Sequence, residues 1–236
     1  MSNRINPNQI KAELDRIIAD ARDAEPQLAE RLRQFSRWIK DKKPGLLTKK
    51  RLVVDLLIEV ILSSDVWLKL KDLNPEERTE LFDILELSPP EIYWYEILFP
   101  KWFRATDPKL TVWTRKIMSE DFPRSDEEFI ERFIAAFNKL KAPTFYNYIL
   151  DLSMATDLII SHLREKPLAV QLTISNPTLL NKKQVDWEET LRYWKIERGV
   201  LFSQSPNHSI DQSIISLLKH SDELEDNCYI VSVSEE

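Results

Sequence analysis

The sequence predicts an α+β protein in which an all-helical domain, residues 1–122, precedes a small α/β domain with a mixed four- to five-stranded sheet, residues 123–236. Two observations predict this division. Before Pro123, apolar residues recur at the three- and four-residue spacing of amphipathic helices. After Pro123, short runs rich in β-branched residues alternate with helical patterns, which is typical of a sheet covered by helices.

Prolines and a glycine separate the helices of the first half. Apolar residues spaced by three and four mark the first helix, and Pro44 with Gly45 ends the second. The third is apolar almost all round, which predicts a central buried helix. Asn74 and Pro75 supply a cap and a first-turn proline for the fourth. In order, the predicted helices span residues 7–22, 27–43, 48–63, 74–87, 89–100 and 107–121.

The second half mixes the two periodicities. It opens with a capped helix that carries Phe129, Phe133 and Phe137 on one face. Three β-rich runs follow, and residues 164–166 form the turn between the last two. In order, the predicted elements are a helix over 125–140, strands over 145–154, 157–163 and 167–175, a helix over 185–197, a strand over 200–203, a helix over 210–219 and a strand over 228–233.

Composition excludes several classes of protein. The single cysteine, Cys228, cannot form an internal disulfide, so we expect no stapled secreted scaffold and a cytoplasmic location. The N-terminal residues lack the apolar stretch of a signal peptide, and the longest apolar run, Leu52 to Leu62, is too short to span a membrane. We therefore expect no membrane association. Two glycines are too few for a phosphate-binding glycine loop or a nucleophile elbow.

The order of elements after Pro123 carries a resemblance. The order is helix, strand, strand, strand, helix, strand, with ATDLII on the second strand and LAVQLTIS on the third. This order resembles the restriction-endonuclease-like fold of the PD-(D/E)xK nuclease superfamily. In that family an Asp opens the second strand, and a Glu or Gln and a Lys lie two apart on the third. Residues i and i+2 of a strand point to one face, so these groups meet beside the Asp. The resemblance covers residues 124–236 and implies a DNA-binding, Mg²⁺-dependent nuclease.

The resemblance also implies individual site residues. Asp157 matches the metal-binding Asp, and Gln171 matches the Glu or Gln that helps to hold Mg²⁺. Thr173 stands where the lysine belongs, and Lys182 or Lys183, ahead of the next helix, can supply the missing positive group. A further acid is implied on the helix before the sheet, and it is Glu131 or one of its neighbours Glu127 and Glu128.

The departures from the family pattern decide the functional prediction. Gln171 is neutral and Thr173 carries no charge, so a hard cation loses a carboxylate ligand and the site loses its strand lysine. We therefore expect a degenerate nuclease-fold protein that acts as a nucleic-acid-binding, sensing or assembly module. The alternative is a Mg²⁺-dependent endonuclease of restriction, defence or DNA repair, in which Lys182 or Lys183 lies within reach of Asp157.

Plainer explanations exist for the same residues. Asp157 can be an ordinary turn residue at the start of a strand, and Gln171 can simply bond a buried polar group. Asp151 is a weaker candidate for a ligand. Seven aromatic residues between Tyr93 and Trp113 are expected mostly to pack between helices, although one face can remain exposed for a protein partner.

Charge is distributed unevenly along the chain. The net charge is −6, yet residues 27–52 hold nine basic and two acidic residues, a net charge of +7 that leaves −13 for the remainder. Such a segment can attract a polyanion, so we expect DNA or RNA phosphates to bind there. The alternatives are a solvated helix face or a complement to the acidic tail, residues 221–236. The candidate contacts are Arg31, Arg37, Lys40, Lys43, Lys49 and Lys50.

Overall fold

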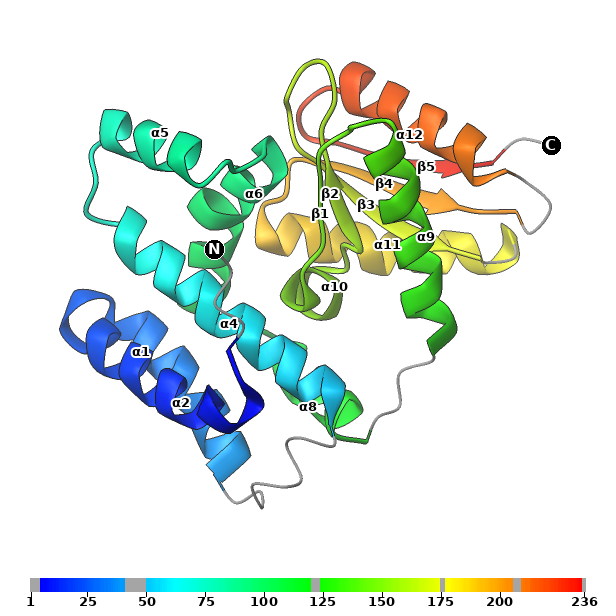
Figure 1. The fold of residues 1–236 in the computed structure, drawn as a ribbon. Helices are drawn as coiled ribbons and strands as arrows, with labels where there is room; N and C mark the ends of the chain where they lie inside the picture. Colours follow the sequence, from blue (N-terminus) through cyan, green and yellow to red (C-terminus); the bar gives the residue numbers. More distant parts are fainter. Residues whose placement is uncertain (1–4, 41–49, 120–123, 175–176, 206–208, 235–236) are drawn as a thin grey trace. The chain divides into compact units, whose positions relative to one another are not determined.

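The structure is a computed structural model that describes residues 5–40, 50–119, 124–174, 177–205 and 209–234 (Figure 1). The chain divides into two compact units. The first contains Met1–Glu86 and Tyr95–Phe122, and the second contains Leu87–Trp94 and Pro123–Glu236. The chain therefore changes unit after residue 122, where the sequence predicts a boundary, but the short segment Leu87–Trp94 also belongs to the second unit.

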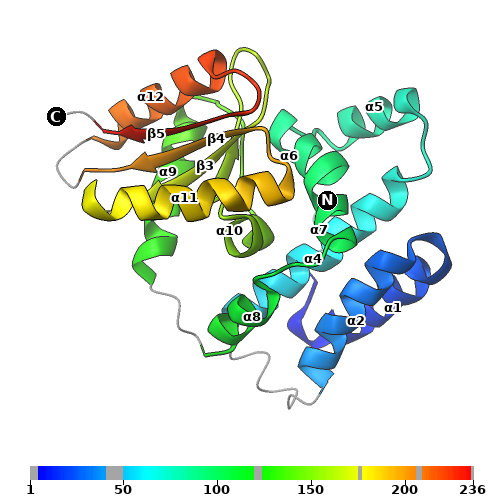
Figure 2. The same ribbon diagram turned by 180° about the vertical axis from the view of Figure 1, so that it is seen from behind.

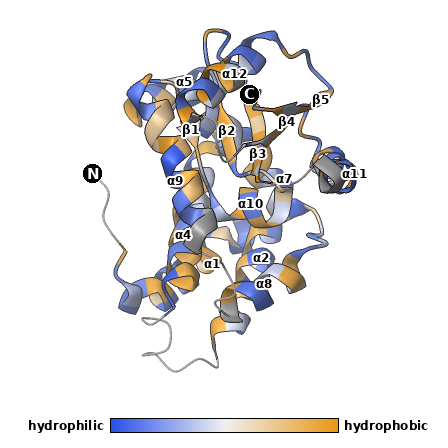
Figure 3. Cartoon of the chain, turned by 90° about the vertical axis from the view of Figure 1, so that its right-hand side faces the viewer, coloured by the Kyte–Doolittle hydropathy of each residue, from blue (hydrophilic) through white to orange (hydrophobic). Residues whose placement is uncertain are grey.

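The described residues of the first unit form helices and no strand. Hydrophobic and hydrophilic stripes run along helices α1 and α2 (Figure 3), as expected for helices with one buried face. Helix α4 continues past the predicted end at residue 63, because Trp67 and Leu70 are also buried. In the parts of the chain that the structure describes, no helix is both long and apolar enough to cross a membrane. The helices are α1 (Ile10–Ala24), α2 (Pro26–Lys40), α4 (Arg51–Leu70), α5 (Pro75–Ile84), α7 (Phe99–Arg104) and α8 (Leu110–Ser119), preceded by the 3-10 helix η1 (Pro7–Gln9).

Two prolines of the first unit begin helices rather than end them. Asn74 caps α5: its side chain accepts a hydrogen bond from the Glu77 N–H at 3.0 Å, and the Glu77 carboxylate accepts one from the Asn74 N–H at 2.9 Å. Pro100 was predicted to end or kink the helix that begins at Pro89. It does not end it, because Pro100 lies in the first turn of α7 and the helical stretch continues to Arg104. The region instead contains α6 (Pro89–Tyr93), the π-helical segment η2 (Trp94–Leu98) and α7.

The second unit is built on one mixed five-stranded sheet in the order β1-β2-β3-β4-β5 (Figures 1 and 2), which confirms the predicted sheet. Strands β1, β2 and β3 are antiparallel neighbours, whereas β3, β4 and β5 run parallel. Helices α9 and α12 cover one face, where they pack against alternate strand residues such as Leu158, Val170 and Val200. Helix α11 covers the other face (Figure 2). The bounds are α9 (Arg124–Lys139), β1 (Thr144–Phe145), α10 (Tyr148–Met154), β2 (Leu158–Ile160), β3 (Leu168–Thr173), α11 (Pro177–Trp194), β4 (Arg198–Ser203), α12 (Ile210–Glu223) and β5 (Cys228–Val233).

The strand predicted over residues 145–154 is largely wrong. Only Thr144–Phe145 forms a strand, and Tyr148–Met154 forms helix α10. The Asn147 side chain accepts a hydrogen bond from the Ile149 N–H at 2.9 Å and so caps this helix. Burial of Ile149 and Met154 on the same short helix then outweighs the β preference of the local composition.

Candidate carboxylate–amide site

The turn after α10 positions Asp157. Ala155 adopts the left-handed conformation, with φ 50° and ψ 47°, and ends the helix. The Thr156 N–H then donates to the carbonyl oxygen of Leu150 at 3.1 Å. The Asp157 N–H donates to the carbonyl oxygen of Val170 at 2.9 Å, which joins Asp157 to strand β3 just before β2 begins.

The side chains of Asp157, just before β2, and Gln171, on the neighbouring strand β3, face each other. The register pairs Leu158 with Val170, so the preceding residue, Asp157, lies opposite Gln171. Leu158 and Val170 point into the core beneath α9 and α12, and alternation along the strands places Asp157 and Gln171 on the other face. The Gln171 Nε2 atom donates to Asp157 Oδ2 at 2.6 Å. The prediction that these two side chains share a face is confirmed, although Asp157 lies one residue before β2 and not on the strand itself.

The Asp157 carboxyl group is buried, with 5 % of the residue exposed. Its Oδ2 atom accepts a second hydrogen bond from the Leu172 N–H at 2.6 Å. Burial raises the pKa of Asp157 well above its ordinary value, and the negative charge of Asp151 raises it further. The hydrogen bonds and the positive charge of Lys183 act in the opposite direction without reversing the shift. The carboxyl group therefore holds its proton to a higher pH than an exposed Asp does.

Two charged residues from neighbouring helices act on this carboxyl group. Lys183 lies on α11 one turn before the buried Trp187, and it is half-buried, whereas Lys182 is exposed. Asp151 comes from the first turn of α10. Of the two candidate lysines, Lys183 is therefore the one whose charge acts on Asp157. Asp151 was predicted to lie on a strand and to be a weaker ligand candidate, whereas it lies on helix α10 and its charge acts on Asp157.

Helix α11 lies close against the sheet beside the site. A Cβ atom added at Gly199 of β4 would come within 2.5 Å of the Leu191 Cδ1 atom and 2.9 Å of the Trp187 Cζ2 atom. Only glycine therefore leaves room for α11 at this distance, and the helix that carries Lys183 is held by close packing.

The structure does not bring Glu131 to the site. Glu131 is exposed on α9, and α9 packs against the opposite face of the sheet. The neighbouring candidates Glu127 and Glu128 lie on the same helix. Thr173 is buried on β3 and adds no charge. Among the described residues, no group of three acidic, histidine or cysteine side chains is placed to hold a metal ion. The prediction of Glu131 as a third ligand is therefore wrong.

Comparisons with known proteins add no assignment. No family model, no curated protein and no solved structure matches this chain.

The predicted basic contact Arg31 is a structural residue. It is 5 % exposed, and its guanidinium group donates to the carbonyl oxygens of Trp102, at 3.0 Å, and Ala105. Its Cζ atom lies 5.1 Å from the centre of the Trp102 ring. Arg31 was predicted to contact phosphate, and this prediction is wrong because burial among carbonyl groups removes the side chain from the surface.

The other predicted basic contacts have different outcomes. Arg37 is exposed and pairs with Glu30 at 3.3 Å. Lys50 is half-buried and lies at the N-cap position of α4. Lys43, Lys49 and the side chain of Lys40 lie outside the described residues.

The aromatic segment contributes to packing. Trp94, Phe99, Trp102, Phe103 and Trp113 are all buried, with at most 3 % of each residue exposed. The two tyrosines of the segment, at positions 93 and 95, are half-buried. The hypothesis of a protein partner bound through this segment therefore has no exposed aromatic face to support it.

Proposed function

We propose that the second unit is a nucleic-acid-binding module of the restriction-endonuclease-like kind, in which the Asp157 site hydrolyses phosphodiester bonds slowly or not at all. The order of elements supports the first part of this proposal. Helix α9, the antiparallel strands β1, β2 and β3, helix α11 and the parallel strand β4 follow the order that the sequence resemblance implies, with α10 added between β1 and β2.

The hydrogen bond from Gln171 to Asp157 supports the second part of the proposal, that the site hydrolyses phosphodiester bonds slowly or not at all. The Gln171 Nε2 atom lies 2.6 Å from Asp157 Oδ2. Its N–H group therefore occupies the position that a cation bound by both side chains would need. A cation there would have to break this bond, rotate the amide to present its oxygen, and compete with protons for a carboxyl group whose pKa is raised by burial. The remaining carboxylate, Asp151, lies on α10. This donor set fits Mg²⁺ poorly, because Mg²⁺ prefers carboxylate oxygens in fixed octahedral geometry.

Nicking of supercoiled plasmid in the presence of Mg²⁺ or Mn²⁺ tests the proposal. We expect the natural protein to nick no faster than Asp157→Asn. Gln171→Glu alone should raise nicking and Mn²⁺ affinity, since a second carboxylate replaces the competing N–H and Lys183 already supplies a positive charge. The loss or gain of one preorganised electrostatic contact changes a rate by about 10²–10³-fold.

Thr173→Lys is the matched control for Gln171→Glu, because it changes the other degenerate position of the same strand face. We expect it to have the smaller effect. Rapid nicking by the natural protein that Asp157→Asn abolishes would overturn the proposal.

The position of Lys183 favours a second candidate, a divalent-cation-dependent endonuclease. Its charge acts on Asp157 from α11, so the missing strand lysine has a replacement. If the natural protein nicks DNA, Lys183→Met should remove the activity and Lys182→Met should leave it, because Lys182 is exposed at the neighbouring position. Equal losses in the two variants, or none in either, would exclude a catalytic role for Lys183.

A further inference from the structure

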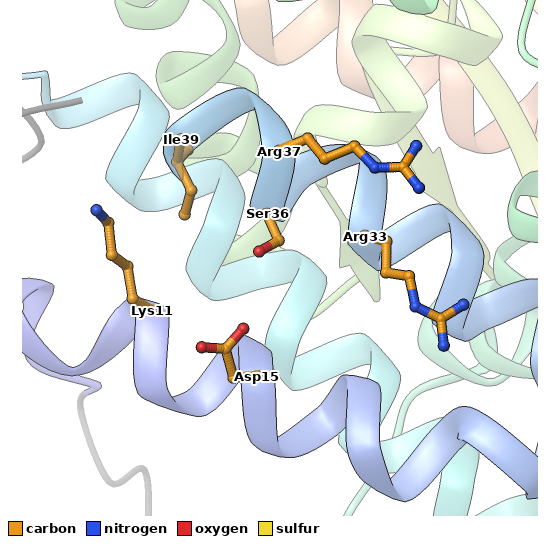
Figure 4. A pocket seen from close by; sticks show the side chains of 6 residues that line it. All are labelled: Lys11, Asp15, Arg33, Ser36, Arg37 and Ile39. Atoms are coloured by element: carbon orange, nitrogen blue, oxygen red, sulfur yellow. The ribbon is translucent and has the colours of Figure 1, made fainter. Parts of the chain in front are cut away.

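The first unit contains a basic groove between α1 and α2. Its cavity volume is about 390 Å³. Figure 4 shows Lys11 and Asp15 on α1, with Arg33, Ser36 and Arg37 on α2. Lys11 lies on one side of Ser36 and the two guanidinium groups lie on the other, so positive groups stand at both ends of the groove. The buried Ile39 also lines it.

The two arginines of the groove are paired, but only with one carboxylate. Arg33 and Arg37 both lie 3.3 Å from oxygen atoms of Glu30. Their side chains are 37 % and 69 % exposed, and that of Glu30 is 48 % exposed. Exposed pairs of this kind contribute roughly 0–1 kcal/mol, so an incoming anion can replace Glu30 at little cost. Lys11, Arg33 and Arg37 stand against the carboxylates of Glu30 and Asp15, so one positive charge remains in excess for such an anion.

The spacing suits a chain of phosphates. Arg33 and Arg37 are four residues apart on α2, so they lie on one side of the helix at about 6 Å along its axis. A guanidinium group forms paired hydrogen bonds to phosphate oxygens.

The surroundings of the groove argue against a membrane or an apolar peptide. Within the described parts of α1 and α2, no large apolar side chain is exposed. A lipid surface or a hydrophobic peptide would need such side chains as anchors. Phosphate groups of a nucleic acid need only the charges, and this binding carries no sequence information.

We propose that the groove between α1 and α2, with Lys11, Arg33 and Arg37 as its positive groups, binds the phosphate backbone of a nucleic acid. The inference rests on the proposed function in that both assume a nucleic-acid ligand. It keeps the predicted contact Arg37, which is exposed, and replaces the buried Arg31 by the half-buried Lys11 and Arg33. It does not depend on the chemistry at Asp157.

Fluorescence anisotropy tests the groove, with a labelled 20-base-pair DNA duplex, the corresponding single-stranded RNA, and EDTA to prevent cleavage. The variant is Arg33→Glu with Arg37→Glu, and the matched control is Arg51→Glu with Lys69→Glu. The control reverses two exposed charges that pair with carboxylates on α4. We expect the groove variant to bind at least about tenfold more weakly than the natural protein at 50 mM salt. The magnitude of the slope of log K against log salt should fall by about two, because two phosphate contacts are lost. The control should bind as the natural protein does, and Asp157→Asn is measured alongside it as a probe of the second unit.

Several outcomes would overturn the inference. Unchanged binding by the groove variant would do so, as would an equal loss in the control. Competition by poly-glutamate as strong as that by unlabelled duplex would indicate an acidic peptide instead. Circular dichroism of the groove variant separates lost binding from lost folding. Loss of binding in Asp157→Asn alone would reject the groove but keep a nucleic-acid ligand for the second unit, so the two proposals fail in different ways.

Discussion

Asp157 is a carboxyl group whose environment favours its neutral form. The residue is buried, and Asp151 adds a second negative charge nearby. A proton removes the repulsion between the two groups and the cost of a buried charge. At the same time, Gln171 and Leu172 donate hydrogen bonds that hold the group in place. The residue thus contributes to the structure of the sheet independently of any catalytic role.

Asp157→Asn should remove a pH dependence of stability. A raised pKa means that the folded state holds the proton more tightly than the unfolded state. The natural protein therefore loses stability as the pH rises through the ordinary Asp range toward the raised value. Asparagine does not titrate, so the variant should gain stability relative to the natural protein over that range.

Urea denaturation at a series of pH values measures this difference. The free energy of unfolding of the variant minus that of the natural protein should increase as the pH rises above about 4, the ordinary pKa of an Asp side chain. A difference that decreases over the same range would show that Asp157 is ionised and stabilised in the folded state.

The elements could be predicted where a periodic pattern agreed with packing. The prediction succeeded for β3 and β5, because both are short runs rich in β-branched residues, and the order of strands in the family resemblance placed Asp157 opposite Gln171. It failed for α10, where a side-chain cap and burial outweighed local β preference. It also began β4 two residues late, because Gly199 is typical of a helix end and the local sequence gives no sign that Arg198 joins the strand.

Arg198, the first residue of β4, shows why the start of this strand could not be predicted from the local sequence. It is 4 % exposed because its guanidinium group donates to the carbonyl oxygens of Lys166, Pro167, Ser221 and Leu224. These acceptors come from segments distant in the sequence. No local pattern therefore predicts the burial of this arginine, and the burial of Arg31 could not be predicted for the same reason.

Asn147→Ala tests the correction at α10. It removes the acceptor for the Ile149 N–H and should lower the free energy of unfolding by about 1 kcal/mol. Asn147→Asp should keep most of the stability, because a carboxylate also caps a helix. Thermal and urea denaturation measure both variants. If the segment were the strand that composition predicts, the two substitutions would have similar effects.

At the scale of the whole molecule, the second unit is discontinuous in sequence. The segment Leu87–Trp94 belongs to it, and the buried Trp94 ring lies 5.9 Å from that of Phe145. The first unit is interrupted in turn, since it resumes at Tyr95. Each unit therefore consists of two segments that are separated in the sequence by a segment of the other unit.

A fragment of residues 123–236 should consequently be less stable than the second unit of the full chain. It lacks Trp94, so the surface around Phe145 that this ring covers is exposed to water. Urea denaturation followed by circular dichroism, together with binding of a hydrophobic dye, compares the two proteins. Equal stability and no added dye binding would show that Leu87–Trp94 contributes nothing to the unit.

The interleaved order also affects how the protein is made. During synthesis, Leu87–Trp94 leaves the ribosome before the first unit is complete and long before most of the strands that it joins exist. At ordinary rates of translation the remaining residues take on the order of ten seconds. For that time the indole ring of Trp94 has no sheet to cover it. The nascent chain thus presents an apolar segment that chaperones can bind, until strand β1 and its neighbours emerge.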